Sequence, residues 1–547
     1  MWRQVSGIPD RLSREYANGI RFGALMRHMV NVDIDVVELG TGAPSRAEVV
    51  SVARDGAQLT LAPDAVAAME HSRSVIEGLA TDPVPHYGVS TGFGALASRH
   101  IPFERRAQLQ RSLVRSHAAS SGPEVEREVV RATMLLRLST LATGRTGVRP
   151  VVAETYVKLL NAGITPVVGE YGSLGCSGDL APLAHCALAL LGEGTVRDAR
   201  GELLSAADAL AAAGIDPVEL REKEGLALIN GTDGMLGMLV LALHDLRALV
   251  TTADLAAGLS VEGLQGTDAV FAADLQALRP HPGQADSAAN IRAVLAGSPM
   301  LSRPEGFTRV QDAYSLRCAP QVHGAVRDTV AHATAVAERE LASAIDNPVV
   351  TLDDRLESNG NFHGAPIGYV LDFLAIAVAD LASMSERRTD RFLDPARNHG
   401  LNAFLADDPG VDSGHMIAQY TQAAIVSELK RLAVPASVDS IPSSAMQEDH
   451  VSMGWSAARK LRRAIDGLGR VLAIELLTSA RAMDLRAPVQ PGPVGSAVRD
   501  RLRTVVDGPA TDRYLAPEIE AAHTMVLDGS LLAAAASVVS QAGGELR

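Results

Sequence analysis

The sequence predicts a mainly α-helical protein, an elongated bundle of long central helices with a loop-rich N-terminal part. Five long stretches contain no proline and carry apolar residues at helical spacing. Prolines stand just outside several of them, as expected for a residue excluded from helix interiors. Hydrophobic residues make up 47% of the chain but aromatic residues only 3%, so the core must consist of Ala, Leu and Val, which favours close-packed helices over sheets.

The five predicted helices are long enough to form rods about 33–57 Å in length, at about 1.5 Å per residue. They cover residues 233–265, 321–346, 367–393, 413–434 and 450–487. Helices of this length bury their apolar stripes against one another, which makes a bundle the economical arrangement. The segment "LAIAVADLASM" (374–384) is apolar nearly all round, so we expect it to contact more than one neighbour, including another copy of the chain.

The first 230 residues differ from the rest because their elements are shorter and rich in turns, as in "YGVSTGFG" (87–94) and "GRTGVRP" (144–150). We therefore predict three parts: an N-terminal extension of unknown role (1–34), an N-terminal domain (35–230), and a long-helix bundle with C-terminal helices (231–547).

Charge and cysteine content limit the possible partners. A net charge of −14 argues against nucleic acid or an anionic membrane as the main partner. The spacing of Cys176, Cys186 and Cys318 matches neither a disulfide framework nor a CxxC metal site. No uninterrupted apolar run reaches membrane-spanning length. We expect a cytoplasmic protein without a metal.

The segment "GSLGCSGDLAPLAH" (172–185) places a glycine-rich turn before an apolar helix. It is not a G-x-S-x-G nucleophile turn, because Asp179 stands where the last glycine is needed, and it lacks the lysine of a phosphate loop. A turn with Asp179 as the N-cap of the next helix explains the backbone. It does not explain Ser177 between Cys176 and Gly178.

This segment resembles the active-site signature of the histidine and aromatic amino acid ammonia-lyase family. Further segments resemble the family in the same order, from about residue 35 to the end: "YGVSTGFG" (87–94), "LQRSLVRSHAA" (109–119), "GLALINGT" (225–232), "RPHPGQ" (279–284), "VQDAYSLRCAPQVHG" (310–324), "DNP" (346–348), "GNFHG" (360–364) and "QEDHVSMG" (447–454). The resemblance implies a fumarase/aspartase-like helical bundle and a homotetramer whose active sites each draw on three subunits.

The resemblance also implies a prosthetic group made from the chain itself. In the family an inner Ala-Ser-Gly, here Cys176-Ser177-Gly178, cyclises into 4-methylidene-imidazole-5-one (MIO), with no metal and no diffusible cofactor. The nitrogen of Gly178 attacks the carbonyl of Cys176, which glycine permits because it has no Cβ. Ser177 then loses water and leaves an electrophilic methylidene. Cys176 contributes only its carbonyl, so cyclisation should proceed, but its thiol predicts altered electronics or an oxidation-sensitive site.

Other site residues follow from the same resemblance. Tyr87 matches the catalytic base, and its pKa, ordinarily about 10, would have to be lowered by positive helix ends or neighbouring donors. Tyr314 matches a second tyrosine near the substrate amine, and Arg317 would hold the substrate carboxylate as a fork. The remaining matches are Asn230, for the carboxylate and the prosthetic-group oxygen, and Gln311 and Phe362, which line the site.

Two polar residues indicate the substrate. Histidine-specific members carry Ser-His at the position of His117 and Glu at the position of Glu448, and a carboxylate can accept an imidazole N–H. The predicted reaction is therefore elimination of ammonia from L-histidine to give trans-urocanate. Departures from the family pattern leave other substrates open: Ser90, Asp233, His415, Tyr420 and Met446.

Two alternatives remain. One is an ammonia-lyase or 2,3-aminomutase acting on tyrosine or a related amino acid, because such members also use a histidine near the distal end of the substrate. The other is an inactive helical scaffold. The scaffold predicts loss of Ser177, Tyr87 or Tyr314, and all three are present.

Overall fold

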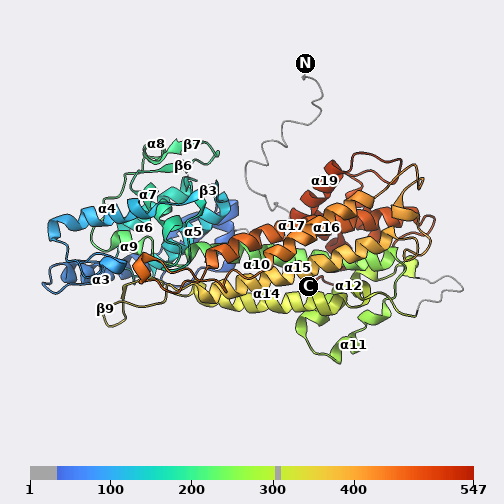
Figure 1. Ribbon diagram of the computed structural model, residues 1–547, viewed down its shortest axis with the longest axis horizontal. Helices are drawn as coiled ribbons and strands as arrows, with labels where there is room; N and C mark the ends of the chain where they lie inside the picture. Colours follow the sequence, from blue (N-terminus) through green and yellow to red (C-terminus); the bar gives the residue numbers. More distant parts are fainter. Residues whose placement is uncertain (1–33, 302–309) are drawn as a thin grey trace, which may run out of the picture.

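The computed structural model describes residues 34–301 and 310–547, and within them it confirms the mainly α-helical fold class. Long helices form a bundle, and the shorter N-terminal elements gather at one end of it (Figure 1). The predicted extension (1–34) lies outside the described residues except for Ile34, which packs against the main core. The division into domains near residue 230 stays a prediction, although α10 begins close to it.

The five predicted long helices are all present, and their ends agree with the prediction within a few residues. Two contain a proline in the first turn, where its missing N–H costs nothing: Pro320 in α14 and Pro366 in α15. The helices are α10 (Asp233–Gly263), α14 (Ala319–Leu341), α15 (Ala365–Leu393), α16 (Met416–Leu432) and α17 (Gly454–Leu485).

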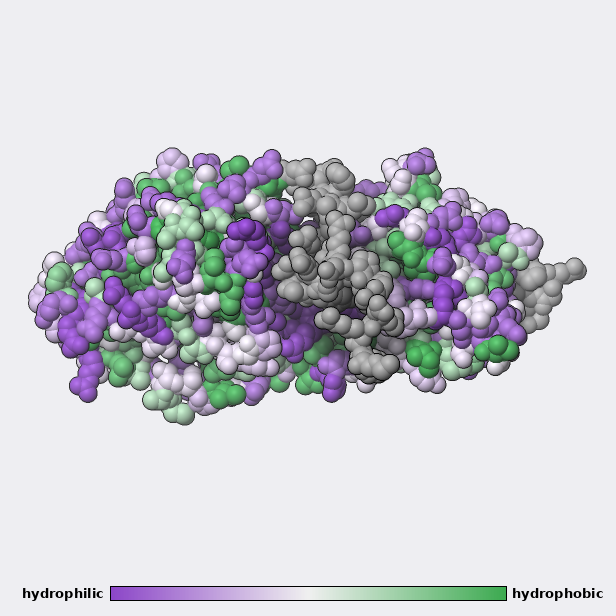
Figure 2. Space-filling model, turned by 90° about the horizontal axis from the view of Figure 1, so that it is seen from above, coloured by the Kyte–Doolittle hydropathy of each residue, from purple (hydrophilic) through white to green (hydrophobic). Residues whose placement is uncertain are grey.

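Helix α10 is the axis of the core: it packs against α17, α14 and α5, and nearly all its side chains are buried. Contrary to the sequence-based expectation, α10 and α15 are each long and apolar enough to span a membrane, with 83% and 61% of the apolar window buried inside the protein. The apolar surface of α10 is therefore used in the core. Helix α15 leaves a stripe exposed, formed by Tyr369, Phe373 and Ile376. On the face of the molecule drawn in Figure 2, hydrophilic and hydrophobic residues are interspersed.

The N-terminal part consists of short helices and small sheets. Its helices are α2 (Arg46–Val50), α3 (Pro63–Ala80), α4 (Arg106–His117), α5 (Arg127–Ala142), α6 (Pro150–Asn161), α7 (Leu180–Leu190), α8 (Ala206–Ala213) and α9 (Glu224–Ala227). Strand β1 (Val36–Leu39) pairs in parallel with β2 (Gln58–Leu61), with Val36 opposite Gln58. Antiparallel pairing joins β3 (Ser121–Glu124) to β5 (Gly169–Tyr171), and β6 (Thr195–Arg197) to both β4 (Thr165–Pro166) and β7 (Leu203–Ser205).

The remaining elements complete the bundle. A short hairpin, β8 (Val349–Val350) with β9 (Leu356–Glu357), precedes α15. The other helices are α11 (Ala273–Ala277), α12 (Pro282–Leu295), α13 (Tyr314–Arg317), α18 (Pro493–Leu502), α19 (Ala516–Leu527) and α20 (Ser530–Gln541). Helices α11 and α12 lie toward the end of the bundle away from α4 and α7 (Figure 1).

Candidate active site

The glycine-rich segment forms a tight loop between β5 and α7. Gly175 and Gly178 both have left-handed backbones, with φ of +67° and +80°. The loop lies against the segment before α10, where the N–H of Asp179 donates to the carbonyl of Gly231 over 2.7 Å. A Cβ at position 178 would collide with that same carbonyl. Only glycine fits at this position, for reasons of both φ and space.

Asp179 occupies the N-cap position of α7, as predicted, but its side chain makes no capping bond to that helix. It accepts instead from the N–H of Met235 in the first turn of α10 (2.8 Å) and from the hydroxyl of Ser173 (2.8 Å). Burial raises the pKa of Asp179 to about 7. This carboxyl therefore joins the loop to the start of the central helix, which the sequence did not reveal.

The tripeptide faces a carboxylate. Ser177 Oγ donates to Glu448 Oε1 over 3.3 Å, and Glu448 Oε2 accepts from Ser443 Oγ over 3.0 Å. Burial, reinforced by the charge of Glu448, raises the pKa of the Cys176 thiol to about 12. Because the thiolate is the reactive form, this environment argues against the predicted oxidation sensitivity.

Tyr87 lies beside this carboxylate, and its environment corrects one expectation. Its hydroxyl accepts the N–H of Gly94 over 3.2 Å, a contact that lowers the phenol pKa. Burial acts more strongly in the other direction, and the charges of Glu448 and Asp346 add to it, so the pKa of Tyr87 is raised. The expected lowering is therefore not produced by the surroundings that one chain supplies.

His117 is the last residue of α4 and lies half-buried in the same region. Its Nδ1 is 2.9 Å from the carbonyl of Leu113, so Nδ1 carries the proton and Nε2 is the acceptor. Burial lowers the pKa of His117, against the opposing charge of Glu448, and so favours the neutral imidazole.

Asn230 is buried beside the loop. Its Nδ2 donates to the carbonyl of Asn347 over 3.0 Å, while its Oδ1 is buried without a partner. The backbone carbonyl of Asn230 accepts from Arg137 Nη1, and Arg137 Nη2 binds the carbonyl of Ile345, both over 2.7 Å. Sequence reasoning missed Arg137. Its signal was a charge inside the apolar run "VVRATMLLRLSTLA" (129–142), which indicates a buried and partnered side chain.

Three predicted residues lie apart from this group: Gln311, Tyr314 and Arg317. Tyr314 is 70% exposed, and the guanidinium carbon of Arg317 lies 4.7 Å from the centre of its ring. The Nε of Arg317 is buried and has no hydrogen-bond partner among the described residues.

The length of α15 shows how far apart the two groups of residues lie. Ser452 lies against Gly364, the residue before α15, and binds the carbonyl of Gly175 over 3.0 Å. Arg388, near the other end of α15, binds the carbonyl of Ser315 over 3.3 Å. These contacts are 24 residues apart, or about 36 Å along a helix. Phe362 stands three residues before α15, at the end near Ser452 and Gly175. Apart from the α13 group, the predicted residues thus come from segments at this end of α15.

Comparison with known proteins identifies the class of molecule. The family model described as aromatic amino acid lyase matches residues 45–504. The chain belongs to the aromatic amino acid lyase family. A histidine ammonia-lyase from Streptomyces avermitilis is 65% identical over 504 residues, which cover 92% of this chain and 98% of that protein. The chain is thus a carbon–nitrogen lyase with an amino acid substrate.

Solved structures related to this lyase share its fold. A tyrosine aminomutase from Streptomyces globisporus is 38% identical with a TM-score of 0.87, covering 92% of this chain and 98% of that one. A histidine ammonia-lyase from Trypanosoma cruzi is 36% identical with a TM-score of 0.85, covering 92% and 95%.

Three of the five departures of this lyase from the family pattern make structural contacts. Ser90 Oγ accepts the N–H of His86 over 2.9 Å, within the Tyr87 loop. Asp233 lies 3.5 Å from the buried guanidinium that holds Asn230. His415 is buried against Thr478 Oγ1 at 3.1 Å, and burial lowers its pKa to about 3. The other two departures, at positions 420 and 446, are exposed.

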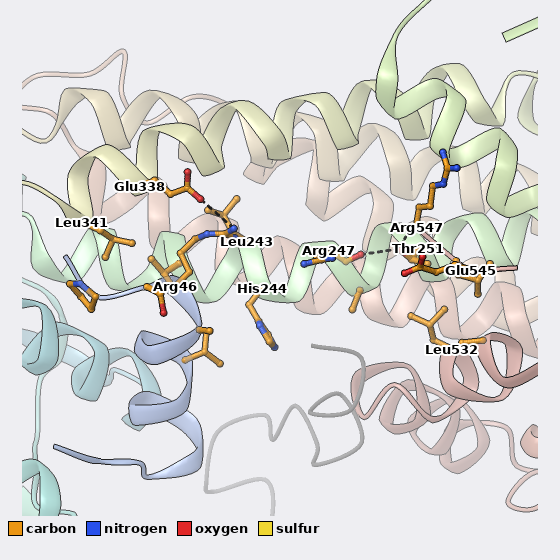
Figure 3. A pocket seen from close by; sticks show the side chains of 18 of the residues that line it. Arg46, Leu243, His244, Arg247, Thr251, Glu338, Leu341, Leu532, Glu545 and Arg547 are labelled. Atoms are coloured by element: carbon orange, nitrogen blue, oxygen red, sulfur yellow. Dashed lines mark hydrogen bonds and ion pairs between the residues drawn. The ribbon is translucent and has the colours of Figure 1, made fainter. Parts of the chain in front are cut away.

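A cavity of about 1030 Å³ in the lyase lies away from these residues. It is bounded by α2, the middle of α10 and the C-terminal residues (Figure 3). Its charged lining includes Arg46, Arg247 and Glu338, and none of the predicted site residues contributes to it. Within 34–301 and 310–547, no group of three or more His, Cys, Asp or Glu side chains is arranged to hold a metal ion.

Proposed function

We propose that this lyase removes ammonia from L-histidine to give trans-urocanate, with a prosthetic group formed from Cys176-Ser177-Gly178. The observation that carries the proposal is the position of Glu448, whose carboxylate lies 3.3 Å from Ser177 Oγ and whose charge acts on His117. The histidine ammonia-lyases at 64–65% identity support the same substrate.

The residues around the tripeptide fit MIO. The left-handed backbone at Gly178, packed against Gly231, provides the tight turn that ring closure requires. Asn230 Oδ1 is a buried acceptor without a partner, which a bound ammonium or amide donor would satisfy. When formed, the group would supply an electrophile for the substrate amine.

Glu448 and His117 provide recognition of the side chain. A carboxylate can accept an imidazole N–H and so fix the orientation and tautomer of the ring. Neutral His117 offers an acceptor at Nε2, because Nδ1 donates to the helix. Beside a phenyl ring, Glu448 would be a desolvated charge without compensation, which disfavours phenylalanine.

Removal of the β-proton falls to Tyr87. One chain leaves its pKa raised, so a working site needs added positive charge. Arg317 of a second copy can supply it while it holds the substrate carboxylate. We therefore infer a homotetramer with shared sites. The apolar stripe on α15, with Tyr420 and Ile417 exposed on α16, suits burial against other copies. An acidic chain with three free cysteines fits the cytoplasm.

The second candidate is a lyase or 2,3-aminomutase acting on tyrosine, since His117 could also bind a phenol and a tyrosine aminomutase shares the fold. Purified enzyme supplied with L-histidine or L-tyrosine separates the two. Release of ammonia together with the ultraviolet absorbance of urocanate supports the proposal. A β-amino acid formed from tyrosine, with no turnover of histidine, contradicts it.

A further inference from the structure

Four fully buried polar side chains cross the core of the bundle at the level of α13. Asp254, His323, Arg388 and Glu475 come from α10, α14, α15 and α17, and all four are shielded from solvent. His323 Nδ1 is 2.7 Å from Asp254 Oδ1, and Arg388 Nη1 is 3.4 Å from His323 Nε2. The side chains therefore form one continuous hydrogen-bonded chain.

The geometry fixes the protons in this chain. A guanidinium can only donate, so His323 Nε2 accepts from Arg388, and Nδ1 carries the hydrogen that goes to Asp254. His323 is thus neutral. Asp254 is balanced by Arg327, whose Nη2 lies 2.6 Å from its second oxygen. The two carboxylates face two guanidiniums, which is the pairing that buried charges need.

Glu475 sets the plane of the Arg388 guanidinium. Its two oxygens accept from Arg388 Nε at 2.5 Å and Nη2 at 2.9 Å, a bidentate fork with defined geometry. The hydroxyls of Ser260 and Ser385 donate to the same two oxygens over 2.6 Å and 2.5 Å. The carboxylate is therefore held from several sides, and the guanidinium of Arg388 has a fixed orientation.

Besides His323, Arg388 Nη1 has a second partner, in α13. Arg388 Nη1 donates to the carbonyl of Ser315 over 3.3 Å. Helix α13 is a single turn, in which the carbonyls of Tyr314 and Leu316 accept from the N–H of Cys318, and the carbonyl of Ser315 accepts from Arg388. Arg388 thus holds the backbone between Tyr314 and Arg317, while the ring of Tyr314 stays exposed and Arg317 Nε has no partner. The contact fixes the backbone and does not involve either of these side chains.

We propose that Arg388, oriented by Glu475 and His323, is a positioning residue that holds α13 so that Arg317 meets the substrate carboxylate. This inference rests on the proposed function, because it takes Arg317 as the carboxylate ligand. Apolar side chains would fill the same space without the cost of desolvating charges. A stabilising role alone therefore does not account for these four hydrogen-bonded side chains.

The test compares a ligand that has a carboxylate with one that lacks it. The double variant Arg388→Gln/Glu475→Gln removes the fork without leaving an unpaired charge. We expect the Ki of urocanate to rise about tenfold, and that of histamine, an imidazole amine without the carboxylate, to stay within about twofold. Partial unfolding lowers the number of active sites and leaves both constants unchanged. The proposal is overturned if neither constant changes or if both rise equally.

A matched control removes an ion pair that does not touch α13. Arg54 forms a fork with buried Asp245, at 2.6 Å and 2.9 Å. Arg54→Gln/Asp245→Asn should leave both Ki values unaltered. If the first double variant gives no soluble protein, Arg388→Lys, which keeps the charge but not the fork, is measured instead with the same expected selectivity.

Arg317→Gln separates this inference from the proposed function. Suppose that Arg317→Gln raises the Ki of urocanate but not that of histamine, and that the Arg388 variants change neither. The positioning role is then refuted, while the assignment of Arg317 as the carboxylate ligand stands. If Arg317→Gln itself shows no selectivity, the assignment of Arg317 fails, and the positioning inference fails with it.

Discussion

Replacing Glu448 by glutamine changes the charge of the proposed imidazole acceptor and little else. In the active enzyme, where the Ser177 hydroxyl has been lost, the carboxylate still accepts from the hydroxyl of Ser443, and an amide oxygen can keep this bond at the same volume. The free energy of unfolding should therefore fall by only about 1 kcal/mol. The variant isolates the charge at the substrate side chain.

The magnitude follows from the strength of a charge-assisted hydrogen bond. A bond to an ionised acceptor is about twice as strong as one between neutral groups, a difference of about 1–2 kcal/mol here. Glu448→Gln should accordingly lower kcat/KM for L-histidine about 5- to 30-fold. L-phenylalanine has no ring N–H, so its low kcat/KM should stay constant or increase once the desolvated charge is gone.

Steady-state kinetics with both amino acids on the same enzyme preparations measure this effect. An equal fall for L-histidine and L-phenylalanine would refute the role of Glu448 in recognition, since that pattern indicates general damage. Thiol alkylation gives an independent check. Because the charge of Glu448 helps to raise the pKa of Cys176, the variant should react with iodoacetamide faster than the parent enzyme.

Three further predictions address the loop, the assembly and acid stability. Gly178→Ala should abolish turnover because its Cβ would meet the carbonyl of Gly231, while circular dichroism stays helical; an active variant would disprove the need for this turn. The Ser177→Ala and Arg317→Gln enzymes, each inactive alone, should regain partial activity when they are dissociated and reassembled together, because the sites are shared between copies. No activity would return if each site were built from one copy of the chain. Burial lowers the pKa of His415 from 6.5 to about 3, so the unfolded state binds more protons and stability is lost as pH falls from 6.5 toward 3. His415→Phe should reduce the difference between urea unfolding at about pH 7 and about pH 5, and an unchanged difference would exclude this residue as the cause.

The long helices were predictable because their periodic apolar residues and flanking prolines are local signals. The role of Cys176-Ser177-Gly178 was predictable because an ordinary glycine-rich turn leaves Ser177 unexplained, while segment 172–185 resembles the active-site signature of the family. Local signals do not specify which copy of a chain completes a site. Ser177 and Arg317 belong to segments held near opposite ends of α15, and the two contacts are about 36 Å apart along that helix; this separation appears only in three dimensions.

Long-range electrostatics were also hidden from the sequence. Arg388 lies in a helix with several charged neighbours, where an arginine is normally solvated, and its partner Glu475 is 87 residues away. The raised pKa of Tyr87 depends on burial and on Glu448, a residue more than 300 positions along the chain. Pairings of this kind follow from packing, which no single segment encodes.

Mass spectrometry of the peptide that contains residues 172–185, taken from active enzyme, tests the central claim most directly. Cyclisation and dehydration at Cys176-Ser177-Gly178 predict a mass lower than that of the unmodified peptide by two molecules of water. The Ser177→Ala enzyme should be inactive, and the same peptide from it should carry no methylidene. An unmodified peptide in enzyme that turns over histidine at full rate would contradict the mechanism.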